Sequence, residues 1–309
     1  MSRQKRVVTS HDISCMGRCS ITVALPILSS LGIETIILPT SILSTHTSGF
    51  EGFTFLDLKD ESRKITKHWE NYPRDIDAIY TGFLGSIEQI EILKEYISKN
   101  PKETFVIVDP AMGDNGELYK IFNSEYAKKM TELCMQASLV IPNVTEACLM
   151  TNTPYLGKVQ TKEQIEDLID KINQLGIDNV VLTSVCLKEH TLGTATKSKN
   201  KEIVYHENEE IKGYFHGTGD VFGSALVGAY VNGISLEKAS EIAADYVIES
   251  IKQTTNKDDF DPKYGVNFEL AIPKLIENIN KKWTLKFEFT YYLLFLIKVL
   301  WYKQESIKD

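Results

Sequence analysis

Short runs of β-branched residues alternate with longer helical patterns along most of this 309-residue chain, and this alternation restricts the fold more than any other feature. The order of strand, helix and strand indicates crossover units, which make neighbouring strands parallel and place helices on both faces of the sheet. We therefore expect an α/β fold, a three-layer αβα sandwich with a central, mostly parallel sheet. Six strands are expected, at Arg6–Thr9, Thr35–Leu38, Ala78–Thr81, Phe105–Asp109, Leu139–Ile141 and Val180–Thr183.

Helices are indicated between these strands by apolar residues at helical spacing, some closed by glycine. They are expected at Ile21–Leu31, Ile87–Ser98, Glu125–Gln136 and Lys162–Leu175, with three more near Val221–Val231, Leu236–Lys252 and Phe268–Asn280. Two extended runs within Thr191–His206, around the polar Lys197–Lys201, predict a hairpin at the sheet edge. No internal repeat or linker interrupts the pattern, so one compact domain is expected.

Charge and cysteine content narrow the class of partner. The net charge of -8, without a basic stripe, disfavours nucleic acid and anionic membranes, so small-molecule partners are expected. No apolar signal-peptide core follows the basic N-terminus, which favours a cytoplasmic location. The odd number of cysteines fits a reducing compartment. Cys15 and Cys19 form the only close pair, and they are expected to be small buried free thiols.

A glycine turn followed by a lone carboxylate, Gly217-Thr218-Gly219-Asp220, precedes a small-residue apolar helix. The free N–H groups at a helix start bind anions, and glycines let a phosphate approach them closely. Asp220 would repel a phosphate that is merely bound, so it is better explained as the group that accepts the proton of a substrate hydroxyl. These four residues are therefore expected to catalyse phosphoryl transfer to an alcohol, although helix capping explains them equally well when they are taken alone.

Polar residues recur where the expected strands end. Ligands of parallel sheets collect beyond these carboxyl ends, so the recurrence favours a functional site at one edge of the sheet. Each set alone also fits a turn or a helix cap. The sets are Ser10 with His11, Thr45–Thr47, Gly82–Ser86, Asp109–Gly116, Asn143–Glu146, and Thr183 with Ser184.

In order and spacing, these segments resemble the pyridoxal kinases of the ribokinase-like superfamily, above all the bacterial pyridoxal/pyridoxamine kinase branch, over about residues 5–282. The resemblance implies a ribokinase-like domain over residues 1–282 that phosphorylates the 5'-hydroxymethyl group of pyridoxal, pyridoxamine or pyridoxine with ATP. It rests on Ser10-His11, Ser44-Thr45-His46-Thr47, Gly82-Phe83-Leu84-Gly85-Ser86, Asp109-Pro110-Ala111-Met112-Gly113-Asp114, Pro142-Asn143-Val144-Thr145-Glu146-Ala147, Thr183-Ser184 and Gly217-Thr218-Gly219-Asp220.

The resemblance also implies roles for individual residues. The vitamer would contact Ser10, Thr47, Phe83 and Asp220, and ATP would contact Asn143, Thr183, Ser184, Thr218 and Gly219. Asp109 and Glu146 would hold Mg²⁺, directly or through water, as suits carboxylate oxygens. Gly113, Asp114 and Gly116 would lie in a flap that closes over the phosphates and excludes water. A homodimer is implied in the same way.

Three positions qualify this picture. Phe83 stands where many relatives have tyrosine, which leaves the preferred vitamer open. Ile141 stands where some relatives place a threonine near a monovalent cation, which leaves the need for such a cation open. His46 is expected to be a hydrogen-bonded loop residue rather than a catalytic base.

Two alternative functions remain. One is a hydroxymethylpyrimidine kinase of thiamine synthesis, which shares the fold, but Cys15-Met16-Gly17-Arg18-Cys19 replaces its early glycine-rich stretch. The other is a non-catalytic binder of pyridoxal phosphate. Asp220 and the glycine turn disfavour it, because a binder needs no proton acceptor beside an anion site. The C-terminal extension, residues 283–309, has no assigned role. Its apolar core Phe289–Ile297 is shorter than the roughly 20 residues that span a bilayer, so no membrane anchor is expected.

Overall fold

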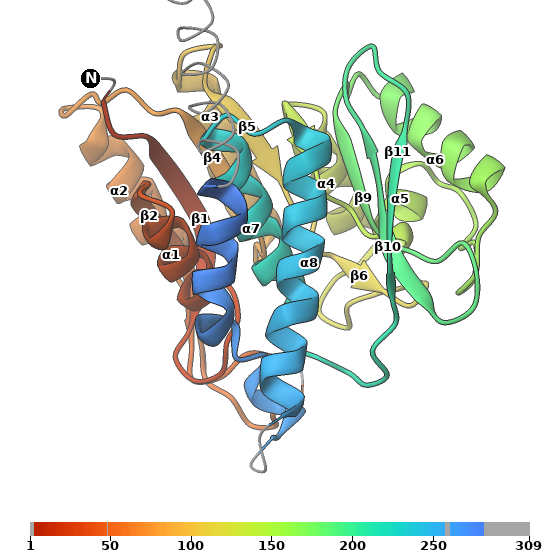
Figure 1. The fold of residues 1–309 in the computed structure, drawn as a ribbon. Coiled ribbons are helices and arrows are strands. Elements are labelled where there is room, and N and C mark those ends of the chain that lie inside the picture. The colour runs from red at the N-terminus through yellow and green to blue at the C-terminus, as the bar shows by residue number, and fades with distance from the viewer. Residues whose placement is uncertain (1–2, 48, 257–259, 281–309) are drawn as a thin grey trace, which may run out of the picture.

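The computed structural model describes residues 3–47, 49–256 and 260–280. Within these residues, a nine-stranded sheet lies at the centre, with helices on both of its faces (Figure 1). The strand order is β11-β10-β9-β8-β5-β4-β1-β2-β3. The extension over residues 283–309 lies outside the described residues, so the expected boundary of the domain stays a prediction.

The six central strands are parallel, and the three outer ones are antiparallel to their neighbours. The expected mostly parallel α/β sandwich is therefore confirmed, as is the hairpin at the sheet edge. The parallel strands are β1 (Arg6–Ser14), β2 (Glu34–Leu43), β4 (Ala78–Thr81), β5 (Phe105–Val108), β8 (Leu139–Val140) and β9 (Val180–Val185), and the antiparallel ones are β3 (Phe55–Asp57), β10 (Thr191–Lys197) and β11 (Val204–Glu209).

Two apolar cores hold the layers together, one on each face of the sheet. Successive strand side chains point to opposite faces, so Val7 packs in one core and its neighbour Val8 in the other. The first core lies under α1 (Ile21–Ser30), α7 (Thr218–Val231), α8 (Leu236–Thr255) and the helical residues 268–280. The second lies under α2 (Lys59–Trp69), α3 (Ile87–Lys99), α4 (Ser124–Cys134), α5 (Val144–Met150) and α6 (Lys162–Gln174).

The structure corrects several sequence-based boundaries. β1 continues to Ser14, so Ser10 and His11 lie inside the strand rather than after it. β9 likewise continues to Val185 and contains both Thr183 and Ser184. Four further features were not predicted from the sequence, namely β3, α2, α5 and a small hairpin formed by β6 (Gly113–Asp114) and β7 (Glu117–Leu118). Across the residues that the structure describes, no helix is both long enough and apolar enough to cross a bilayer.

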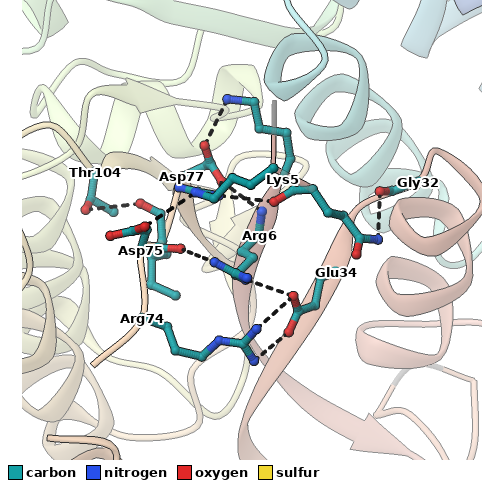
Figure 2. A network of polar contacts seen from close by, with 11 residues as sticks. Lys5, Arg6, Gly32, Glu34, Arg74, Asp75, Asp77 and Thr104 are labelled. Carbon is teal, nitrogen blue, oxygen red and sulfur yellow. Dashed lines mark hydrogen bonds and ion pairs between the residues drawn. The ribbon is translucent and has the colours of Figure 1, made fainter. Parts of the chain in front are cut away.

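The amino ends of the central strands carry a network of paired charges, drawn in Figure 2. Nε of Arg6 lies 2.8 Å from Oε2 of Glu34, and Oε1 of the same carboxylate lies 2.7 Å from Arg74. Nζ of Lys5 lies 2.9 Å from Oδ1 of Asp77. These bonds join the start of β1 to the first residue of β2 and to the segment before β4, at the end of the sheet opposite the expected site.

Candidate functional site

The turn before α7 requires glycine at position 217. Gly217 has φ 74°, a left-handed conformation that side chains disfavour, and a Cβ there would collide with the carbonyl oxygen of Arg18. Gly219 is exposed, and a Cβ there would meet nothing within 4 Å. The start of α7 is thus seated against the loop after β1 and remains open at Gly219, where an anion can approach the backbone.

Asp220 is half-buried in the first turn of α7. Burial raises the pKa of its carboxyl to about 6, and the charge of Asp12 acts in the same direction. The backbone N–H of Ser20 and the thiol of Cys19 lower this pKa and so limit the shift. The Cys19 Sγ lies 3.2 Å from Oδ2 of Asp220. A carboxylate with this pKa is a better proton acceptor near neutral pH than an ordinary aspartate.

A second carboxylate, Asp109, follows β5 and is also half-buried. Its pKa lies well above the usual range, first because of burial and then because of the negative charges of Glu146 and Asp220. Its Oδ1 accepts a hydrogen bond from the Ala111 N–H at 3.1 Å. Asp109 therefore shares one electrostatic environment with the two other acids, and a bound cation would stabilise its charged form.

Glu146, on α5, is 2 % exposed and holds the β6–β7 hairpin in place. Its Oε1 accepts a hydrogen bond from the Met112 N–H, and its Oε2 accepts one from the Asn143 N–H, both at 2.9 Å. Burial raises its pKa to about 7 despite these bonds. Within the described ranges, no group of three or more histidine, cysteine or acidic side chains is arranged to hold a metal ion, so a cation here would need ligands beyond these carboxylates.

The β6–β7 hairpin contains the three residues expected in a flap, Gly113, Asp114 and Gly116. Asn143 Nδ2 donates to the carbonyl oxygen of Gly113 at 2.9 Å, and the Gly116 N–H donates to Oγ1 of Thr145 at 2.9 Å. A Cβ at Gly113 would lie 2.6 Å from the carbonyl oxygen of Glu117, which explains the glycine. The side chains of Asn143 and Thr145 therefore hold the hairpin against the start of α5.

The other residues expected to contact ATP lie near α5 and α7. Asn143 forms a bridge with Thr183, whose hydroxyl donates to the carbonyl oxygen of Pro142 at 3.4 Å. Ser184 is exposed and has φ 59°. Thr218 directs its hydroxyl to the carbonyl oxygen of Phe215 at 3.1 Å.

The residues expected to contact a vitamer are less closely grouped. Ser10 is 1 % exposed and lines a small internal cavity with Leu38, Thr40 and Gln89. Thr47 is exposed, and Phe83 is half-buried with its ring centroid 5.7 Å from that of Phe122. No described contact joins Ser10, Thr47 and Phe83 to one another.

His46 links the loop after β2 to the approach to the glycine turn. Its Nε2 lies 2.6 Å from the carbonyl oxygen of Lys263, and its ring centroid lies 4.9 Å from that of His216. The expectation of a hydrogen-bonded loop residue is confirmed.

Three residues at the site, Asp12, Thr145 and Cys19, have a role that the sequence did not reveal. Asp12 is 3 % exposed, accepts a hydrogen bond from Ser14, and raises the pKa of Asp220 through its charge. Thr145 holds the hairpin, as described above. The expectation of two small buried thiols was wrong, because Cys15 is exposed and Cys19 is half-buried against Asp220. Asp12 and Cys19 both lie within ten residues of Ser10. This short separation is the only sign in the sequence that they belong to the site.

With this geometry established, comparison with known proteins decides the family. The phosphomethylpyrimidine kinase family model matches residues 23–263. The chain belongs to this family. The matched range includes Asp109, Glu146 and Asp220, whereas Asp12 and Cys19 precede it.

Relatives in this family include pyridoxal kinases, which confirms the resemblance found in the sequence. The pyridoxal kinase of Arabidopsis thaliana is 29 % identical over 230 residues, 68 % of this chain and 70 % of the relative. The pyridoxine/pyridoxal/pyridoxamine kinase of Bordetella avium is 27 % identical over 269 residues, 80 % of this chain and 85 % of the relative.

Solved structures show the same fold. A candidate phosphomethylpyrimidine kinase of Bacteroides thetaiotaomicron is 34 % identical with a TM-score of 0.85, covering 89 % of this chain and 94 % of that one. A second crystal form of that protein contains pyridoxal. The pyridoxal kinase of Lactobacillus plantarum is 26 % identical with a TM-score of 0.82, covering 91 % of this chain and 99 % of that one.

Proposed function

We propose that this protein transfers the γ-phosphoryl group of ATP to the 5'-hydroxymethyl group of pyridoxal, pyridoxamine or pyridoxine. The observation that carries the proposal is Asp220, a carboxylate with a pKa of about 6 directly after a glycine turn at a helix start. Named vitamer kinases among the relatives, and pyridoxal in a crystal form of the Bacteroides protein, support the choice of substrate.

In the proposed reaction, Asp220 orients the substrate hydroxyl and accepts its proton as the oxygen bonds to the γ-phosphorus. The bond from that phosphorus to the bridging oxygen of ATP breaks, and ADP leaves with the electron pair. Backbone N–H groups of the turn Gly217, Thr218 and Gly219 stabilise the charge on the transferring phosphoryl group. Because this transition state is loose, correct placement of the hydroxyl matters more than early removal of its proton.

Magnesium fits the acidic pair Asp109 and Glu146, since hard cations prefer carboxylate oxygens. Asp109 accepts one described hydrogen bond and keeps capacity for a direct contact, whereas both Glu146 oxygens accept backbone N–H bonds, which favours a contact through water. A bound Mg²⁺ supplies charge neutralisation to the phosphates. The need for a monovalent cation, which Ile141 leaves open, is tested by comparing turnover in potassium and in tetramethylammonium buffers.

The proposal includes the remaining contacts expected from the sequence. ATP lies against Asn143, Thr183, Ser184, Thr218 and Gly219, the vitamer against Ser10, Thr47 and Phe83, and the hairpin with Gly113, Asp114 and Gly116 closes over the phosphates. A cytoplasmic homodimer is proposed as the working form. Sedimentation of the purified chain tests the dimer.

A second candidate substrate is hydroxymethylpyrimidine, a close chemical relative of the phosphomethylpyrimidine that the description of the matching family model names. The deciding experiment mixes purified protein and Mg-ATP with each vitamer or with hydroxymethylpyrimidine, beside an Asp220→Asn control. Phosphorylation of a vitamer that the control lacks supports the proposal. Phosphorylation of hydroxymethylpyrimidine alone selects the second candidate, and binding of a vitamer without any turnover identifies a non-catalytic binder.

A further inference from the structure

The loop between β1 and α1 brings a thiol to the carboxylate that the proposed function uses as its proton acceptor. Cys19 Sγ lies 3.2 Å from Oδ2 of Asp220, although 201 positions separate the two residues. Ser20 directs its hydroxyl to the same sulfur at 3.8 Å. A thiol that donates to a carboxylate makes a charge-assisted hydrogen bond, which is stronger than the same bond to a neutral acceptor.

The thiol is the donor in this contact. Burial, followed by the charges of Asp220 and Asp12, raises the pKa of Cys19 well above its usual range. The sulfur therefore keeps its proton at neutral pH and can donate it in a hydrogen bond to Oδ2 of Asp220. A thiolate beside Asp220 would repel it instead.

The position of this thiol is fixed by contacts on both sides of the loop. The Arg18 N–H donates to the carbonyl oxygen of Tyr264 at 3.1 Å, and Nε of Arg18 lies 2.9 Å from both carboxylate oxygens of Glu269. Thr22 Oγ1 donates to the carbonyl oxygen of Cys19 at 2.7 Å. The Arg18 carbonyl also packs against Gly217, so the loop is in direct contact with the start of α7.

We infer that Cys19 is a positioning residue, which binds Oδ2 of Asp220 and thereby turns Oδ1 toward the substrate hydroxyl. This inference rests on the proposed function. A carboxylate held at one oxygen loses rotational freedom about its own axis, so the second oxygen meets the hydroxyl in one orientation. Cys19 itself need not touch the substrate. Its removal is expected to slow the chemical step more than it weakens binding.

The test compares Cys19→Ala with Cys19→Ser, which keeps a donor of similar size. We expect Cys19→Ala to lower kcat about tenfold with KM for the vitamer changed less than about twofold. Cys19→Ser is expected to restore kcat to within about threefold of the parent protein, since its hydroxyl donates to the same carboxylate. Cys15→Ala, which removes the exposed thiol of the same loop, is the matched control and should leave kcat unchanged.

Two results would overturn the inference. One is a Cys19→Ala enzyme with kcat within about twofold of the parent. The other is a Cys19→Ser enzyme as slow as Cys19→Ala, because sulfur packing rather than the donated proton would then matter. Thermal unfolding of each variant shows whether it is folded. Loss of turnover in Asp220→Asn with full turnover in Cys19→Ala rejects this inference alone, whereas a parent protein that phosphorylates no substrate rejects the proposed function and the inference together.

Discussion

The two ends of the central sheet treat their acidic residues in opposite ways. At the amino ends, Glu34 and Asp77 are each paired with basic side chains (Figure 2). Bonds from Arg6 and Arg74 lower the pKa of Glu34, and bonds from Lys5, Arg6 and Arg3 lower the pKa of Asp77 although its partial burial opposes them.

At the carboxyl ends, the acids lie close to one another instead. Among the described residues, Asp109, Glu146 and Asp220 form no ion pair with lysine or arginine, and their pKa values are all raised. Uncompensated charge destabilises a fold, whereas it prepares a site to bind a cation or to accept a proton. The comparison indicates that one end of the sheet is built for stability and the other for chemistry.

The largest effect should come from removing the proton acceptor. Asp220→Asn keeps the shape of the side chain but cannot accept a proton, so kcat should fall about 10²- to 10⁴-fold. The fold should remain intact, because the amide no longer carries a buried charge. Product formation at saturating ATP, measured together with thermal unfolding, checks both statements. A variant that keeps more than about a tenth of the parent kcat would contradict the role of Asp220.

Asp109→Asn should separate stability from activity at the same end of the sheet. The substitution removes repulsion with Glu146 and Asp220, so Tm should rise by about 2–4 °C. Activity at 1 mM Mg²⁺ should fall at least about tenfold, because a proposed ligand of the metal is lost. Calorimetry and a magnesium titration of the rate provide the measurements. A lower Tm would show that Asp109 stabilises the fold, which would contradict the view that the acids at the carboxyl ends destabilise it.

Acid should slow the enzyme through Asp220. Its pKa of about 6 in the folded protein lies above the ordinary value, so protonation removes the acceptor as the pH falls through that range. We expect kcat to decrease about tenfold between pH 7 and pH 5, which a pH profile in constant ionic strength measures. A profile that is flat over this interval would mean that another group accepts the proton.

The smallest effect on activity is expected at the amino ends. Asp77→Ala removes an acceptor for Arg3, Lys5 and the Arg6 N–H, so the free energy of unfolding should decrease by about 1–2 kcal/mol at pH 7. Because the pKa of Asp77 is lowered in the folded state, this contribution is fully present above the ordinary aspartate pKa and should be lost as the pH falls through the lowered one.

The matched control for Asp77 is Asp75→Ala. The Asp75 side chain is 80 % exposed, so its removal should change stability by less than about 0.5 kcal/mol. Urea unfolding of the three proteins measures the differences, and kcat should be the same in all of them. An Asp77→Ala enzyme with impaired kcat would mean that the two ends of the sheet are coupled.

Local patterns sufficed for most of the fold. The apolar runs of β4 and β5 and the amphipathic spacing of α6 are signals within one segment, and their bounds agree with the sequence prediction within about one residue. The end of β1 was not predicted, because Ser10, His11 and Asp12 form a polar run typical of a loop. They are buried in a strand since the surrounding elements cover them.

A part of the candidate site can be predicted where the backbone conformation permits only one residue type. Gly217 is such a position, because its φ and its contact with Arg18 exclude other residues. The contact between Cys19 and Asp220 cannot be predicted in this way, since each residue is compatible with many local structures and only the folded chain brings them together. Which oxygen of Asp220 is held, and by what, could therefore only be learned from the structure.

The contact of Arg18 with the Tyr264 carbonyl cannot form early during synthesis of the chain. The two residues are 246 positions apart, and at about 5–20 residues per second a ribosome needs roughly 12–50 s to join them. Throughout that interval the first loop has been made but lacks the segment that seats it. The loop around Arg18 thus waits for the segment around Tyr264, so a nascent kinase is expected to stay inactive until that segment has been made.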